Sequence, residues 1–272
     1  MRKVIIPFDG GKFSESAISF SISLNESDPI LLTGIFFSKV DFLSFFLFPP
    51  SIANALPRPV KEIEKGEIEK AIEMFINRCK VHNIDYRIHK EIDDLAVPQL
   101  TKETRFADLM IMGSEIFASN TSEKNSNTFL KDTLQHTECP VLIVPDDSYS
   151  PSQNILAYDG SASSVFAIKQ FAYLFPNLCT NKTILVYASE DTDDIPAQEN
   201  IEELAASHFS DLAITLLNTG KRKNFSEWVL KHEHPLLISG SFGRSGFSSL
   251  FTKSFVTDII EAHQTPVFIA HQ

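Results

Sequence analysis

Short apolar runs alternate along the chain with longer segments in which apolar residues recur with the period of an amphipathic helix. The short runs are rich in β-branched and aliphatic side chains, which is typical of buried strands. This alternation predicts an α/β fold in which helices connect the strands of open parallel sheets and cover both faces. We expect strands near residues 3–8, 30–37, 85–90, 107–112, 140–144, 153–158, 182–188, 211–217, 235–239 and 266–270. We expect helices near residues 12–24, 59–83, 93–104, 128–137, 162–175, 197–207, 222–233 and 253–263.

The longest predicted helix, at 59–83, shows the pattern most clearly. It opens at Pro59, a residue suited to a first helical turn, and places Ile68, Ile72 and Phe75 on one face with charged residues between them. The sequence therefore predicts one buried face and one solvated face for this helix.

Segments of the first half of the sequence recur in the second half. The segment Ile-Ile-Pro-Phe-Asp-Gly-Gly at 5–11 corresponds to Leu-Ala-Tyr-Asp-Gly-Ser at 156–161, so that Asp9 matches Asp159. The closing segments match in the same way, 109–114 with 236–241 and 139–143 with 265–269. A repeat of this length indicates a duplicated domain.

A polar stretch bounded by prolines, residues 145–152, separates the two halves and is typical of an exposed linker. We therefore place one domain at 1–147 and a second at 153–272. Each is expected to hold an open, doubly wound sheet of about five parallel strands.

Composition excludes several classes of protein. A formal net charge of -11 with no basic stripe argues against nucleic acid as a partner. No segment approaches the roughly 20 apolar residues of a membrane helix, so no membrane insertion is expected. Only a few apolar residues separate Met1-Arg2-Lys3 from Pro7, which favours a buried strand over a signal peptide. The three cysteines have no metal-ligand spacing and fit packing roles in a reducing compartment, so we expect a soluble cytoplasmic protein.

The most specific candidate for binding chemistry is a glycine- and serine-rich turn after the apolar strand at 235–239. The turn and the predicted helix that follows contribute Gly240, Ser241, Gly243, Arg244, Lys253 and Ser254. Such a turn exposes backbone N–H groups at a helix N-terminus, and glycine lets a phosphate approach the main chain closely. The arginine and lysine would add positive charge for the phosphates of a nucleotide. The same residue types also fit a plain tight turn.

At these residues, and over nearly its whole length, the chain resembles the universal stress protein family, specifically tandem members with two such domains. Nucleotide-binding members carry a Gly-x-x-Gly pair, nine residues, and then Gly followed by Ser or Thr. Gly240, Gly243 and Ser254 meet this signature, whereas Lys253 stands where glycine is expected. The lysine either crowds the approach of a phosphate to the backbone or pairs with a phosphate oxygen, and the sequence leaves both open.

The resemblance implies a cytoplasmic stress-response protein whose second domain binds ATP or a related adenine nucleotide, with Mg²⁺, as a regulatory ligand. In ATP-binding relatives the aspartate after the first strand contacts the adenosine, and the end of the second strand lines the base. Asp159 and Ala188 hold those positions here. No dedicated catalytic base is evident, so little or no turnover is expected, and a slow ATPase is the last of our hypotheses.

The resemblance also bears on assembly. Family members commonly dimerise through their last strands, which implies that residues 141–144 and 267–270 face each other within this one chain. The tandem would then form an intramolecular pseudo-dimer with an approximate two-fold axis. Whether two chains associate further stays open.

The first half has lost the nucleotide signature. Glu115 adds negative charge where a phosphate would lie, and the segment 120–128 contains no glycine. We therefore expect no nucleotide in the first domain, where Asp9 fits equally well as the cap of the helix that follows.

The first half instead carries an aromatic insertion at 42–48, Phe-Leu-Ser-Phe-Phe-Leu-Phe, followed by two prolines. The insertion either covers apolar surface of its own or the other domain, or forms an exposed patch for a protein partner or an apolar ligand. The second interpretation gives our alternative function, an interaction module without nucleotide chemistry. Neither a zinc-binding spacing nor a Gly-x-Ser-x-Gly elbow occurs, so we expect no metal site and no catalytic triad.

Overall fold

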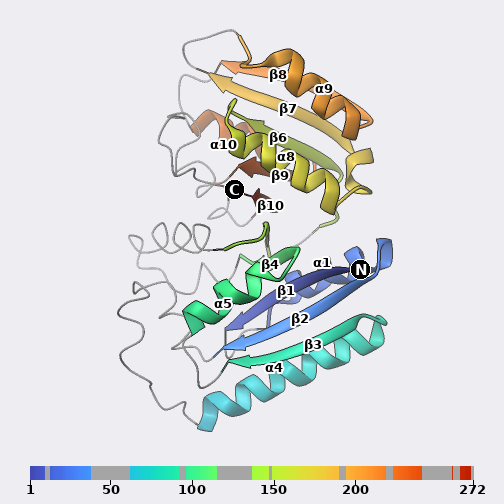
Figure 1. Cartoon of the computed structure of the whole chain (residues 1–272), viewed down its shortest axis with the longest axis vertical. Coiled ribbons are helices and arrows are strands. Elements are labelled where there is room, and N and C mark those ends of the chain that lie inside the picture. The colour runs from blue at the N-terminus through green and yellow to red at the C-terminus, as the bar shows by residue number, and fades with distance from the viewer. Residues whose placement is uncertain are drawn as a thin grey trace. The chain divides into compact units, whose positions relative to one another are not determined.

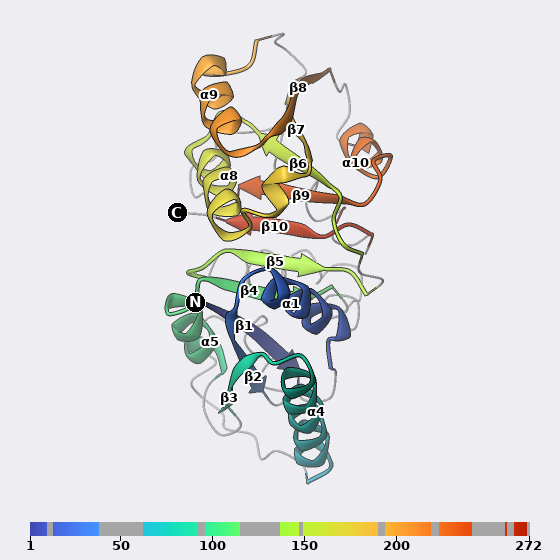
Figure 2. The same ribbon diagram turned by 90° about the vertical axis from the view of Figure 1, so that its right-hand side faces the viewer.

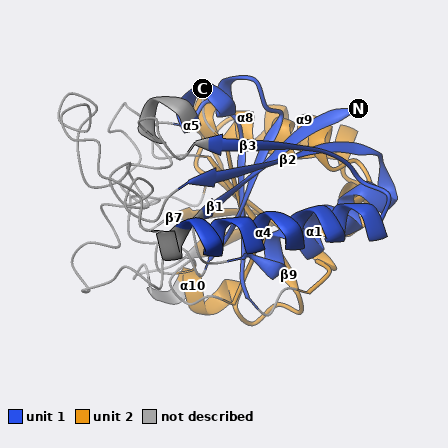
Figure 3. Ribbon diagram, turned by 90° about the horizontal axis from the view of Figure 1, so that it is seen from below, with its two compact units in different colours: residues 1–146 blue, residues 147–272 orange. Residues whose placement is uncertain are grey.

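The computed structural model describes residues 1–9, 13–37, 62–91, 96–114, 137–146, 149–189, 194–218, 223–240, 259 and 264–270. The chain divides into two compact units, residues 1–146 and 147–272, which Figure 3 shows in separate colours. The boundary between the units falls within the stretch 145–152 that the sequence marks as a linker.

In the first unit, parallel strands follow the order β3-β2-β1-β4-β5. The strands are β1 (Arg2–Asp9), β2 (Ile30–Phe37), β3 (Asp85–Glu91), β4 (Leu109–Gly113) and β5 (Val141–Val144). The described helices are α1 (Glu15–Ser27), α4 (Glu62–Val81) and α5 (Ala96–Arg105). Figures 1 and 2 show α1 and α4 on one face of these strands and α5 on the other. Because helices cover both faces, the central strands carry fully buried apolar runs, residues 4–6 in β1 and 110–112 in β4.

The second unit repeats this winding. Its parallel strands follow the order β10-β9-β6-β7-β8. The strands are β6 (Gln153–Tyr158), β7 (Lys182–Ser189), β8 (Asp211–Asn218), β9 (Pro235–Gly240) and β10 (Val267–Ala270). The helices are α8 (Ala162–Leu174), α9 (Gln198–His208), α10 (Lys223–Val229) and the 3-10 turn η1 (Leu178–Thr180). In Figure 2, α8 and α9 lie on one face and α10 on the other, which confirms the predicted doubly wound fold.

One helix is shorter than the sequence predicts. The sequence predicts a helix near 222–233, but α10 ends at Val229. The chain then passes through a turn in which His234 has a φ of 46°, and β9 begins at Pro235. A residue that precedes proline avoids the helical region, so the helix ends before this point. The predicted helices at 128–137 and 253–263 fall almost wholly outside the described residues.

Aromatic side chains fill the core of the first unit. The Phe8 ring on β1 stacks on Phe36 of β2, with centroids 4.7 Å apart. Phe75 of α4 meets both rings edge-on, at 5.8 Å and 5.9 Å, and has no exposed surface. Ile68 and Ile72 of the same helix are buried with it, which confirms the predicted buried face. The stretch 59–61, including Pro59, lies outside the described residues.

The end of the predicted linker is attached to the second unit. The Tyr149 hydroxyl donates to the Pro235 carbonyl at 2.8 Å, and its ring stacks on His234 with centroids 4.6 Å apart. The Ser152 amide donates to the carbonyl of His234 at 3.1 Å. Burial raises the pKa of Tyr149 to about 12. The expectation of an exposed linker is therefore wrong for this tyrosine, whose hydroxyl and ring both find partners beside β9.

The three thiols are buried, as their predicted packing role requires. Burial raises the pKa of Cys79 and Cys139 to about 12 and that of Cys179 to about 11, from 9.0 in each case. Above pH 9.0 the unfolded chain therefore releases protons that the folded chain retains. The stability that these thiols contribute is complete below that pH and is lost as the pH rises towards their folded values.

We expect a Cys139→Ala variant to lose stability less steeply than the original chain when the pH is raised. The slopes should differ by about 1.4 kcal/mol per pH unit between pH about 9 and about 11, because only one of the two chains ionises this thiol on unfolding. Urea unfolding at pH about 8 and about 10.5 measures the difference. Equal slopes for the two chains would contradict the assignment.

Candidate functional site

A tight turn follows β6 in the second unit and contains the predicted Asp159. One carboxylate oxygen, Oδ1, accepts a hydrogen bond from the Ser161 amide at 2.9 Å. Gly160 between them has a φ of 78°, which favours glycine, and a Cβ there would lie 2.9 Å from Pro196. Burial raises the pKa of the neighbouring Tyr158, and the charge of Asp159 adds to the shift. Asp159 therefore has a structural role in this turn.

Helix α8 begins directly after the turn. Ser161 is its N-cap, and its Oγ accepts a hydrogen bond from the Ser164 amide at 3.1 Å. The N-terminus of α8 thus lies at the carboxyl end of β6, beside Asp159, and its first turn carries no negative side chain.

Gly240, the last residue of β9, packs against the first turn of α8. A Cβ on Gly240 would lie 2.6 Å from the Ser163 carbonyl carbon and 2.6 Å from the Ser164 nitrogen. Both are backbone atoms of a helix, so neither can move aside without displacing α8. The glycine is therefore needed for the packing of α8 against the end of β9.

The strand register brings three of the predicted site residues to one edge of the sheet. β6 lies between β9 and β7, with Ala157 opposite Ser239 and Tyr158 opposite Tyr187. Asp159, Ala188 and Gly240 follow these positions directly, so all three stand at the carboxyl ends of adjacent parallel strands. Ala188 is buried, with 6% of its surface exposed, and pairs with Leu217 of β8.

The rest of the predicted cradle falls outside the described residues. These positions are Ser241, Gly243, Arg244, Lys253 and Ser254. The aromatic insertion at 42–48 and the loop at 115–128 of the first unit also lie outside the described residues.

The corresponding carboxyl ends of the strands in the first unit are surrounded by hydrogen bonds within that unit. Ser14 is the N-cap of α1 and accepts from the Ala17 amide at 3.4 Å, as Ser161 does for α8. After β4, the Ser114 amide donates to the Val144 carbonyl at 2.7 Å. This amide is therefore engaged within the first unit and does not point towards a ligand.

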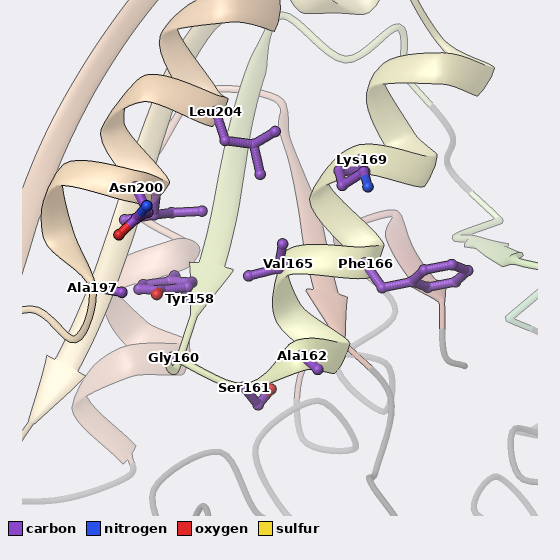
Figure 4. Close-up of a pocket in the computed structure, with 11 residues that line it drawn as sticks. Tyr158, Gly160, Ser161, Ala162, Val165, Phe166, Lys169, Ala197, Asn200 and Leu204 are labelled. Atoms are coloured by element: carbon purple, nitrogen blue, oxygen red, sulfur yellow. The ribbon is translucent and has the colours of Figure 1, made fainter.

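A groove between α8 and α9 was not predicted from the sequence (Figure 4). It has a volume of about 350 Å³ and is lined by Tyr158 of β6, Val165 and Lys169 of α8, and Asn200 and Leu204 of α9, among others. These residues lie far apart in the sequence and form no motif. Only the packing of the two helices on one face of the sheet brings them together.

Among the described residues, no group of three or more His, Cys, Asp or Glu side chains is placed to hold a metal ion. Within the same part of the chain, no helix is both long enough and apolar enough to cross a membrane.

Comparisons with known proteins find similarity to universal stress proteins. No family model matches the chain. Two curated universal stress proteins of Mycobacterium tuberculosis, from strains H37Rv and CDC 1551, are each 25% identical over 208 residues, which span 68% of this chain and 69% of theirs. A solved universal stress protein from Archaeoglobus fulgidus aligns with 100% of this chain and 96% of its own, with a TM-score of 0.64 and 14% identity. A functionally unknown protein from Pseudomonas aeruginosa aligns with 100% of this chain and 92% of its own, with a TM-score of 0.55 and 11% identity. These two structural matches concern the fold alone.

Proposed function

This chain is a relative of the universal stress proteins, and we propose that its second unit binds ATP or a related adenine nucleotide as a regulatory ligand. The observation that carries the proposal is the position of Asp159 and Gly240 at the carboxyl ends of β6 and β9. The winding of the sheet reverses between these two neighbouring strands, because β6 leads to β7 on one side while β9 returns on the other. Open parallel sheets bind ligands at such a point.

The chemistry of the loop after β9 supports the same ligand. Gly243 and Ser254 would supply backbone and hydroxyl donors to the phosphates, and Arg244 would supply positive charge. Mg²⁺ would accompany the nucleotide through its phosphate oxygens. No residue is assigned as a catalytic base, so the ligand is proposed to act by occupancy and not by turnover.

The test is calorimetric titration of nucleotide-stripped protein with Mg-ATP. We expect saturable binding near one site per chain, lost in a Gly243→Val variant and weakened about tenfold in Ser254→Ala through loss of one phosphate contact. Gly240 is a poor choice for this purpose, because its replacement also disturbs the packing of α8. A Lys253→Gly variant decides the role of the lysine: tighter binding means that its side chain obstructs the phosphate, and weaker binding means that it pairs with it.

Two aspartate variants form a matched control. Asp159→Asn keeps an oxygen for the Ser161 amide but removes the charge, so the turn stays intact while contact with the nucleotide weakens. Asp9→Asn changes the corresponding residue of the first unit and should leave binding unchanged. Absence of saturable heat at millimolar Mg-ATP would contradict the proposal. Phosphate release that disappears in Ser254→Ala would show turnover.

A further inference from the structure

The groove between α8 and α9 has the dimensions of a small-molecule site. Its volume of about 350 Å³ is at the lower end of the range of roughly 300–1,000 Å³ that is typical of such sites. Figure 4 shows Val165 on α8 and Leu204 on α9 on opposite sides of the groove, with Tyr158 near the end of the strand below.

The interior of the groove is apolar. Tyr158 and Ile201 are each only 2% exposed, and Val165 and Leu204 are half-buried. The Tyr158 hydroxyl is already committed, because it donates to the Pro196 carbonyl at 2.7 Å. The apolar body of a ligand would therefore contact mainly aliphatic side chains and an aromatic ring.

Lys169 is the one cation among the described residues that line this groove. It is half-buried on α8, and within the described part of the chain it makes no ion pair and no side-chain hydrogen bond. This is notable in a chain with a net charge of -11, where carboxylates outnumber cations. Asn200 also lines the groove, but Figure 4 shows it on the facing helix, across the groove from Lys169. A single positive charge suits a monoanion better than a phosphate, which carries more charge and accepts more hydrogen bonds.

The two units differ at positions that line this groove. By the repeat, Phe8 stands in place of Tyr158, and the uncharged Ser19 stands in place of Lys169. In the first unit, Phe75 of α4 packs edge-on against Phe8 and Phe36 and fills the space between helix and sheet. In the second unit, Tyr158 and Tyr187 are 6.5 Å apart and tilted, and no described phenylalanine of α9 inserts between them. The lysine beside the groove is therefore a feature of the second unit.

From this combination we propose that the groove between α8 and α9 binds a small monocarboxylate with an apolar body. The carboxylate pairs with the Lys169 ammonium, while the apolar part lies on Val165, Ile201 and Leu204. This site is separate from the phosphate end of the proposed nucleotide site, which uses the loop after β9, although its lining includes Gly160 and Ser161 beside Asp159.

The experiment is calorimetric titration of the full chain with 4-phenylbutyrate and, separately, with its neutral amide. We expect saturable binding of the carboxylate to the original chain. Lys169→Met keeps an apolar stem of similar length and should weaken carboxylate binding about tenfold or more, with no change for the amide. Lys182→Met, at an exposed position at the start of β7, is the matched control and should change neither.

Val165→Phe should abolish binding of both compounds by filling the groove. If this variant does not fold, the comparison of Lys169→Met with Lys182→Met alone decides the question. Absence of saturable binding to the original chain, or equal affinity in Lys169→Met, would overturn the proposal. Competition between Mg-ATP and 4-phenylbutyrate would overturn the claim of a separate site.

Discussion

Replacing Phe75 with alanine is expected to lower the free energy of unfolding of the first unit by about 4 kcal/mol. The ring has no exposed surface and meets Phe8 and Phe36 edge-on at 5.8 Å and 5.9 Å, so its removal leaves a cavity between α4 and the strands. The aromatic contacts are lost in addition to the burial of apolar surface. Urea unfolding measures the total change.

Phe106→Ala is the control for this prediction. Phe106 is 64% exposed, so its truncation should change stability by no more than about 0.5 kcal/mol. Hydrogen exchange followed by mass spectrometry can assign the loss of protection to a unit, which matters because two units need not unfold in one step. Similar losses for the two phenylalanine variants would refute the assigned core.

Replacing Gly240 with alanine is expected to destabilise the second unit by about 2 kcal/mol, and valine should cost more. The new Cβ would stand 2.6 Å from two backbone atoms in the first turn of α8, so the helix must shift away from the end of β9. The exchange protection of α8 and β9 should therefore fall, while that of α4 in the first unit stays unchanged.

Gly66→Ala is the matched glycine control. Gly66 lies within α4, and a Cβ there would meet nothing within 4 Å. Alanine is the better helix former, so this variant should gain about 0.5–1 kcal/mol. A Gly240→Ala variant as stable as the original chain would show that α8 can shift at little cost in free energy. Ligand binding would then be the one role left for Gly240.

The strands and most of the helices could be predicted because their periodicity comes from burial on a regular backbone. The strand 153–158 has its predicted bounds, and Ile68, Ile72 and Phe75 lie on the buried face of α4 as their spacing indicates. The predicted end of α10 was wrong by several residues. The end of this helix depends on the turn at His234 and on Tyr149, whose ring stacks on His234.

The candidate site could be predicted in part. A repeat and a parallel winding suffice to place Asp159 and Gly240 at one edge of the sheet, since strand ends in such a fold share that edge. The sequence could not show that Gly240 touches the backbone of α8, because this contact joins residues far apart along the chain. For the same reason it offered no sign that Lys169 would line a groove with Asn200.

The sequence alone determined the duplication, the alternation of strands and helices, and the glycine-rich signature with its lysine in place of a glycine. These are properties of local order and spacing, which the chain carries before it folds. The tertiary structure alone decided that Gly240 lies against α8 and that Tyr149 attaches the linker beside β9. It also decided that Lys169 lies beside apolar side chains without a counterion among the described residues. Such features depend on distances between segments that only packing brings together.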